Sequence, residues 1–223
     1  MFILLVIMIT FFTQSYESHA SVFLVDSGGV RVYKKIQSLK DLRDKNIIKQ
    51  KLDYSCGTAS LATLLTFYFG QQTSEQEILD TILKDRSEEE KTIIRENGFS
   101  LLDLKMAAEA LGYKAAGFQL KLEHLKKLKG PVIVYIKPRG YKHFAIFKGV
   151  RGDRVYLADP TRGHIRLSIE RFSRIWDGTI FVLGNKDIED NLTTYPLKIT
   201  TGHPVQPETL NIRQMIDSSR FTY

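Results

Sequence analysis

Cysteine is almost absent from this chain of 223 residues, which contains only one, Cys56. A single cysteine excludes an internal disulfide, so no covalent cross-link within the chain supports the fold. Three of the histidines, His124, His164 and His203, lack the spacing to cysteines or carboxylates that would form a metal site. We therefore expect no metal and no other cofactor.

Long apolar runs are also scarce. The run from Phe2 to Phe12 is too short to span a bilayer, and small and polar residues follow it up to Ala20. This pattern is typical of a secretory signal peptide over residues 1–20, cleaved near Ala20. Because its start carries no Lys or Arg, an uncleaved anchor is the alternative. We expect a periplasmic or secreted protein without stable membrane insertion after signal cleavage.

A concentrated stripe of basic residues is missing as well. The formal net charge is +7, but the lysines and arginines are scattered and are not interleaved with aromatic residues. Nucleic-acid binding would require basic side chains gathered in one motif or on one face, so we do not expect it. The length suffices for one domain with extensions.

Helical patterns fill the first half of the sequence. A short extended arm over residues 21–37 precedes Ser38, which caps a short helix, and a longer helical pattern runs from Cys56 to Phe69. Further helices are predicted by three capping boxes, namely Ser74 with Glu77, Ser87 with Glu90, and Ser100 with Asp103.

The second half of the sequence changes to the period of β-strands. Predicted strands are Lys114–Leu120, Pro131–Ile136, His143–Val150, Arg154–Ala158, His164–Leu167 and Thr179–Leu183. Pro131–Ile136 is almost continuously apolar, which predicts a central strand. Short helices are expected over Leu122–Lys129 and from Ser168 to Trp176. The pattern predicts an α+β fold over residues 38–184, with a helical N-terminal half packed on an antiparallel sheet, followed by an extension of unassigned role over residues 185–223.

Cys56 opens the longest of the helical patterns. A thiol in the first turn of a helix faces unpaired backbone N–H groups and the positive end of the helix dipole, and both favour the thiolate. The alternative is a small buried cysteine that only packs. Because an exported chain keeps this thiol without a disulfide partner, we favour a nucleophile.

A cysteine nucleophile requires a base, a group that orients the base and donors for the oxyanion. His143 begins one predicted strand and Asp159 ends the next, so antiparallel pairing would bring them together. Gln50, six residues before Cys56, is an uncharged amide donor suited to an oxyanion hole alongside the Cys56 backbone N–H. Structural interpretations exist for both members of the pair, since a lone histidine at a strand start is commonly structural and Asp-Pro is foremost a turn signal.

Gln50, Cys56-Gly57, His143-Phe144 and Asp159-Pro160 together resemble the C39 peptidase family, which comprises papain-like cysteine peptidases best known as N-terminal domains of bacteriocin-exporting transporters. The resemblance extends from about Ser38 to Gly184. It implies a papain-like fold in which the cysteine is the nucleophile, the histidine the general base and then acid, the aspartate the orienting residue, and the glutamine the oxyanion donor.

The sequence contains neither the membrane nor the ATPase segments of the transporter-linked members. It is more similar to stand-alone exported C39-like proteins, some of which accompany functional-amyloid (Fap-type) fimbria systems. We therefore expect an exported cysteine endopeptidase that hydrolyses a co-secreted protein or leader peptide, in the biogenesis of extracellular amyloid fimbriae. A catalytically silent module that binds an exported polypeptide is the alternative, and acyl transfer to an amine would use the same residues. The sequence predicts neither the substrate sequence nor the oligomeric state.

Overall fold

The computed structural model describes residues 22–27, 30–35, 38–184 and 194–199. The chain divides into two compact units after Ser38. In the first unit, β1 (Val22–Ser27) and β2 (Val30–Lys35) pair as an antiparallel hairpin, so the predicted arm consists of two paired strands. The predicted signal peptide lies outside the described residues, as does the C-terminal extension apart from residues 194–199.

Helices form the first part of the second unit. They are α1 (Leu39–Asp44), α2 (Cys56–Phe67), α3 (Glu75–Leu83), α4 (Glu88–Asn97) and α5 (Leu101–Ala110). All three predicted capping boxes are present at the starts of α3, α4 and α5, where the serine side chain and the third helical residue satisfy each other's backbone N–H groups. Within the part of the chain that the structure describes, no helix has the length and apolar character needed to cross a bilayer.

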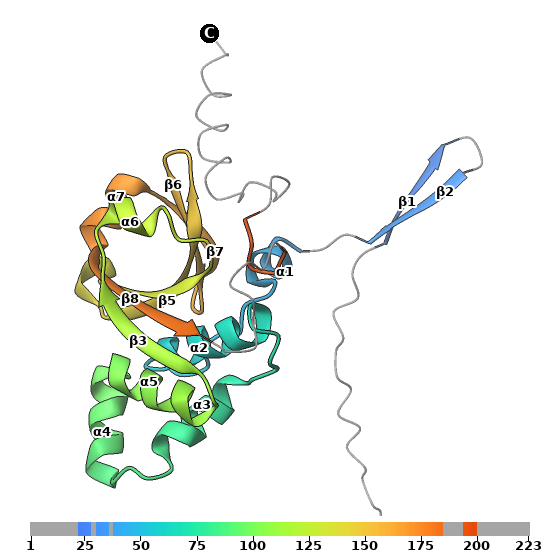
Figure 1. Cartoon of the computed structure of the whole chain (residues 1–223). Coiled ribbons are helices and arrows are strands. Elements are labelled where there is room, and N and C mark those ends of the chain that lie inside the picture. Colours follow the sequence, from blue (N-terminus) through green and yellow to red (C-terminus); the bar gives the residue numbers. More distant parts are fainter. Residues whose placement is uncertain (1–21, 28–29, 36–37, 185–193, 200–223) are drawn as a thin grey trace, which may run out of the picture. The chain divides into compact units, whose positions relative to one another are not determined.

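A six-stranded antiparallel sheet forms the rest of this unit, in the order β3-β8-β4-β5-β6-β7 (Figure 1). Its strands are β3 (Lys114–Gln119), β4 (Val132–Ile136), β5 (His143–Arg151), β6 (Arg154–Asp159), β7 (Gly163–Ser168) and β8 (Trp176–Gly184). The short helices are α6 (Leu122–Leu125), the 3₁₀ turn η1 (Pro138–Gly140) and α7 (Ile169–Ile175). The predicted α+β fold and the central place of β4 are confirmed.

Two boundaries differ from the prediction by three residues or more. The basic helix expected over Leu122–Lys129 ends at Leu125, because the N–H groups of Lys127 and Leu128 donate to carbonyls three residues back in place of four. The last strand begins at Trp176 rather than Thr179, since Trp176 already pairs with Ile136 of β4. The strand therefore starts where α7 ends.

Alternate residues of the central strands enter two separate cores. Ile133, Phe144 and Ile146 pack with buried residues of α2, α3 and α5, whereas Val134 and Phe147 face a second core that includes residues of α6 and α7. Cover on both faces explains the nearly continuous apolar sequence of β4. Helix α2 packs against β5 and between the other helices, so the N-terminal half of the chain meets the sheet along this contact (Figure 1).

Candidate active site

Cys56 is the first residue of α2 and is 8% exposed. Its helix begins differently from α3, α4 and α5, because no side chain caps its N-terminus. The preceding Ser55 is fully buried, and its hydroxyl instead donates to the carbonyl of Leu52 at 2.8 Å. The first backbone N–H groups of α2 therefore have no side-chain cap, and they lie beside the only thiol of the chain.

Gly57 allows the start of α2 to approach the sheet closely. A Cβ atom at this position would lie 3.1 Å from the Phe144 ring and 3.2 Å from the Leu104 side chain. Phe144 directly follows His143 in β5. The absence of a side chain at Gly57 thus brings the thiol-bearing end of α2 to the histidine-bearing end of β5.

His143 and Asp159 contact each other across the paired strands β5 and β6. The distance from His143 Nε2 to Asp159 Oδ1 is 3.1 Å, and the Asp159 side chain is fully buried. Cys56 lies close enough to the same ring to raise the pKa of His143. Because Nε2 is engaged by the carboxylate, Nδ1 is the ring nitrogen that remains to accept a proton from a thiol.

Charge and burial act in opposite directions on this pair. Burial alone would lower the pKa of His143, but hydrogen bonds and negative charge from Asp159 and Cys56 outweigh it and raise the pKa to about 9. Burial would raise the pKa of Asp159, yet the hydrogen bond and charge of His143, together with Arg162, hold it well below its ordinary value. An imidazolium–carboxylate pair therefore exists at neutral pH.

Asp159 is held by the turn that follows it as well as by the histidine. Its Oδ1 accepts from the backbone N–H groups of Thr161 at 2.8 Å and Arg162 at 3.0 Å. Its Oδ2 accepts from Nε of Arg162 at 2.8 Å, with Nη2 of the same side chain also at 2.8 Å. The carboxylate is thereby fixed in orientation and ionised.

Gln50 lies in the loop before α2 and contacts that same turn. Its backbone N–H donates to the carbonyl of Pro160 at 3.1 Å, and its side-chain Oε1 accepts from the Thr161 hydroxyl at 2.7 Å. Its Nε2 donates to the carbonyl of Leu52 at 2.9 Å and lies 3.5 Å from that of Asp53. The structure thus places Gln50 next to the Asp159 turn, and its role as an oxyanion donor stays a prediction.

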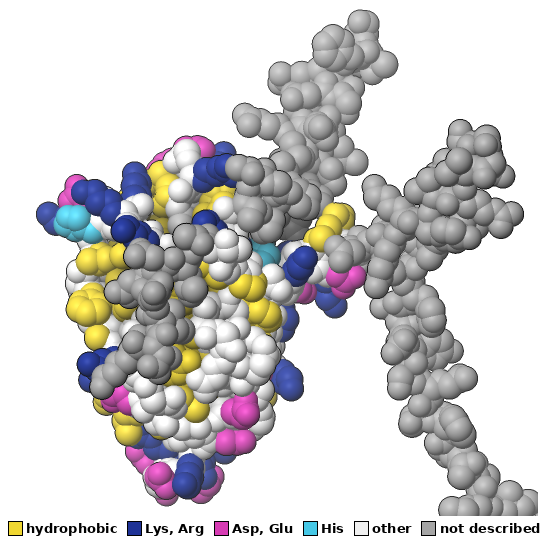
Figure 2. Space-filling model, turned by 45° about the vertical axis from the view of Figure 1, so that its right-hand side comes forward, with side chains coloured by type: hydrophobic (Ala, Val, Ile, Leu, Met, Phe, Trp, Pro, Cys, Tyr) yellow, Lys and Arg dark blue, Asp and Glu magenta, His cyan; other side chains and the backbone are white. Residues whose placement is uncertain are grey.

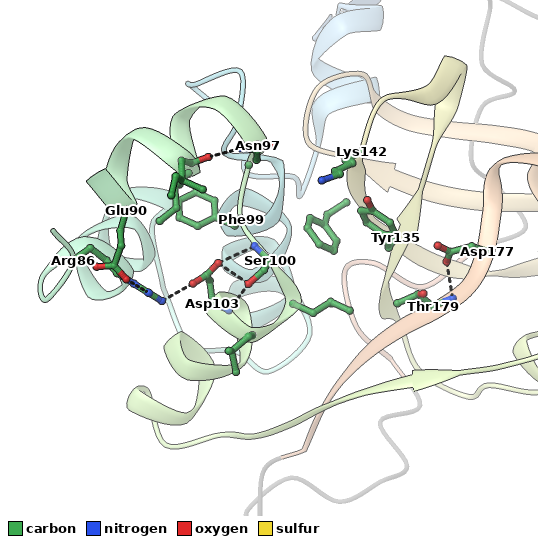
Figure 3. A pocket seen from close by; sticks show the side chains of 16 residues that line it. Arg86, Glu90, Asn97, Phe99, Ser100, Asp103, Tyr135, Lys142, Asp177 and Thr179 are labelled. Carbon is green, nitrogen blue, oxygen red and sulfur yellow. Dashed lines mark hydrogen bonds and ion pairs between the residues drawn. The ribbon is translucent and has the colours of Figure 1, made fainter. Parts of the chain in front are cut away.

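A pocket of about 640 Å³ is lined by Lys142 and Phe144, the two neighbours of His143 in sequence, but by none of the four candidate catalytic residues themselves. One wall comes from α4, α5 and the loop between them, and the other from the sheet and the approach to His143 (Figure 3). The apolar lining residues are Ile93, Ile94, Phe99, Leu101, Leu102, Tyr135 and Phe144. Figure 3 shows Arg86 joined to Glu90 and Asp103 in the helical wall, while Lys142 lies on the opposite side.

Sequence reasoning missed both this pocket and the contribution of the Asp159 turn. The sequence signal for the pocket was the adjacent apolar pairs Ile93-Ile94 and Leu101-Leu102, because consecutive residues do not share one face of a helix. In the structure Ile93 and Leu102 line the pocket and are 57% and 62% exposed. Thr161 and Arg162 follow an Asp-Pro pair, where a carboxylate commonly accepts from the N–H groups of the next residues.

In residues 38–184 and 194–199, no three His, Cys, Asp or Glu side chains come together as metal ligands. On the face drawn in Figure 2, Lys and Arg side chains are interspersed with acidic and hydrophobic ones. That face has no continuous basic track of the kind that nucleic acid requires.

Comparison of the sequence with known proteins gives a consistent result. The family model described as Peptidase C39 family matches residues 44–187. The probable functional amyloid protease FapD of Pseudomonas aeruginosa is 38% identical over 156 residues, which cover 70% of this chain and 68% of that protein.

Solved structures show the same similarity. A double glycine motif protease from an AMS/PCAT transporter, crystallised in complex with the leader peptide, is 28% identical with a TM-score of 0.50, and the match covers 61% of this chain and 89% of that one. The peptidase domain of Streptococcus ComA, a bi-functional ABC transporter involved in quorum sensing, is 22% identical with a TM-score of 0.54, and the match covers 63% and 98% of the two chains. The predicted papain-like fold is confirmed.

Proposed function

The chain belongs to the peptidase C39 family and is a cysteine peptidase, and on that premise we propose that Cys56, His143, Asp159 and Gln50 hydrolyse peptide bonds of an exported polypeptide. The observation that supports this assignment is the hydrogen bond between the buried Asp159 carboxylate and the His143 ring, with Cys56 at the uncapped start of α2 close enough to raise the pKa of that ring.

In this mechanism, Nδ1 of His143 holds the thiol proton, and the sulfur of Cys56 attacks the carbonyl carbon of the substrate. The oxyanion that forms accepts hydrogen bonds from the Cys56 backbone N–H and from the Gln50 carboxamide. His143 then donates its proton to the leaving amine, and a thioester remains on the sulfur. Water, deprotonated by the same ring, attacks the thioester and releases the second product. Asp159 keeps the ring oriented and stabilises its positive charge throughout.

We propose that the substrate is a polypeptide with apolar side chains. Seven aliphatic and aromatic residues from α4, α5, the loop between them and the sheet line the pocket together with polar and charged ones, and they form a surface suited to such side chains. The relative from Pseudomonas aeruginosa is described as a probable functional amyloid protease, and a structural relative is bound to a leader peptide. A secreted amyloid subunit, or the leader of a co-secreted protein, fits both descriptions.

We also propose that the protein acts in the periplasm or outside the cell. The apolar run of Phe2–Phe12 and the small residues up to Ala20 support export with cleavage near that alanine. N-terminal sequencing of the protein recovered from a cell fraction tests this part, and an intact Met1 would contradict cleavage.

Alkylation of Cys56 with iodoacetamide across pH tests the catalytic proposal. The full chain without residues 1–20 should alkylate well below the ordinary thiol pKa of about 8.5, and His143→Ala should lose this low-pH reactivity, while Cys56→Ala corrects for background. Mass spectrometry of candidate amyloid subunits and leader peptides, incubated with the wild type and with Cys56→Ala, then detects cleavage. The catalytic proposal would be contradicted if Cys56 of the wild type reacts like a free cysteine and the candidate polypeptides are bound but not cleaved. That result would favour a binding module.

A further inference from the structure

We propose that Thr161 is a positioning residue for the peptidase reaction: its hydroxyl orients the Gln50 carboxamide, so that one turn holds both the oxyanion donor and the carboxylate behind the base. This inference rests on the proposed role of Gln50. It concerns a residue 111 positions away from Gln50 in the sequence.

Thr161 contacts both parts of the site at once. Its backbone N–H donates to Oδ1 of Asp159 at 2.8 Å, and its hydroxyl donates to Oε1 of Gln50 at 2.7 Å. The Gln50 backbone N–H donates back to the carbonyl of Pro160 at 3.1 Å, and Nζ of Lys49 donates to the carbonyl of Thr161 at 2.6 Å. Three hydrogen bonds therefore join the loop before α2 to the turn after β6.

The two ends of the Gln50 carboxamide are distinguished by their surroundings. On one side the Thr161 hydroxyl donates to Oε1, and on the other Nε2 donates to the carbonyl of Leu52 at 2.9 Å. A flipped carboxamide would place Oε1 against the Leu52 carbonyl, where two acceptors would repel each other. Without the hydroxyl, only the Leu52 contact would hold this orientation.

One hydrogen of the carboxamide is left for an oxyanion. Of the two hydrogens on Nε2, one is used in the 2.9 Å bond to Leu52, and the other is near the Asp53 carbonyl at 3.5 Å, which is a weak contact. A developing negative charge would compete successfully for this second hydrogen. Holding Oε1 on Thr161 keeps it directed away from that charge.

The exposed position of Thr161 makes the hypothesis testable without unfolding the protein. Thr161→Val keeps the shape and the backbone N–H that binds Asp159, and it removes only the hydroxyl. Thr161→Ser restores a hydroxyl. Thr92→Val is a matched control, because the Thr92 hydroxyl donates to the carbonyl of Glu88 at 2.9 Å, and this exposed side chain does not line the pocket.

Two reactions of Cys56 separate an effect on the oxyanion from an effect on the thiol. Alkylation by iodoacetamide displaces iodide and forms no oxyanion. In acylation by a p-nitrophenyl ester, the sulfur attacks the carbonyl carbon, an oxyanion forms, the carbon–oxygen bond breaks, and p-nitrophenolate leaves as the thioester forms. The yellow product gives the acylation rate in a single turnover.

We expect Thr161→Val to slow acylation by about three- to tenfold, the value of one hydrogen bond, and to leave alkylation within about twofold of the wild type. Thr161→Ser should restore acylation. Combined with Gln50→Ala, the valine variant should add no further loss, because both changes act on one group.

The inference is overturned if Thr161→Val acylates like Thr92→Val, or if acylation and alkylation fall together, since a joint loss would mean that Thr161 acts through the Asp159–His143 pair. Failure of the proposed function gives a different result, namely a wild-type Cys56 that is not acylated at all.

Discussion

Replacement of Asp159 by Asn tests whether the buried carboxylate controls the charge of His143. The carboxylate accepts from His143 Nε2, from two backbone N–H groups and from the Arg162 guanidinium. An asparagine offers one oxygen in place of two, so its NH₂ group must face either the guanidinium or the donors on the other side. The pKa of His143 loses its main upward cause and should fall toward or below 6.5, because burial then dominates.

The magnitude follows from the raised pKa of His143. The difference between the ordinary 6.5 and about 9 corresponds to roughly 3 kcal/mol of folded-state stability, at about 1.4 kcal/mol per tenfold change in proton binding. Because the folded-state pKa is the higher one, this stability is present in full below pH 6.5 and is lost as the pH rises through about 9. The lowered pKa of Asp159 describes the same ion pair from the acid side, where stability is lost as the pH falls below the ordinary 3.8.

Urea unfolding at a series of pH values between 6 and 10 measures this effect. The wild type should lose roughly 3 kcal/mol across the window from pH 6.5 to about 9 relative to Asp159→Asn. Burial also lowers the pKa of Lys148 to about 8, which acts in an overlapping range, but Lys148 is present in both proteins and its contribution cancels in the difference. Asp153→Asn is the control, because this carboxylate is 77% exposed and pairs only with the neighbouring Arg154. Parallel stability curves for the wild type and Asp159→Asn would refute the reasoning.

Two further predictions concern packing around the site and a buried charge outside it. Gly57→Ala should destabilise the fold by about 1–3 kcal/mol and slow the alkylation of Cys56. The reason is that the new Cβ atom would lie 3.1 Å from Phe144 and 3.2 Å from Leu104. A thermal unfolding midpoint equal to that of the wild type would contradict this prediction. Lys148→Met should stabilise the protein by about 1–2 kcal/mol at pH 7, since burial lowers the pKa of Lys148 to about 8 and its Nζ lies 3.4 Å from His164. The gain in unfolding free energy should shrink as the pH rises through about 8, because the buried Lys148 then becomes neutral. Urea unfolding that shows the same gain at every pH would exclude this explanation.

Much of the fold could be predicted because its signals are local. The three capping boxes fix the starts of α3, α4 and α5 through contacts within four residues, and the turn around Gly152 places β5 beside β6. That hairpin is also why the proximity of His143 and Asp159 could be inferred. The contact of Cys56 with the ring was expected only from the resemblance, since no local pattern relates α2 to β5.

The parts that could not be predicted depend on contacts between distant segments. The hydrogen bond from Thr161 to Gln50 joins residues 111 positions apart, and the sequence pattern of neither segment predicts it. The pocket likewise requires α4 and α5 to face the sheet at a particular distance, which only packing determines. The early end of α6 reflects a change to hydrogen bonds that reach three residues back at Lys127 and Leu128, which the basic and apolar pattern of this segment did not predict.

The contact between α2 and β5 also affects the order in which the protein gains reactivity. The thiol belongs to the helical half of the chain and its proposed base to the sheet half, 87 positions later in the sequence. Under that proposal, a chain in which only the first half has folded has a cysteine without a base, and one in which β6 has not yet paired lacks the carboxylate that keeps the ring charged. We therefore expect the thiol to become reactive late in folding, so that the rate at which this reactivity develops measures the docking of the two halves.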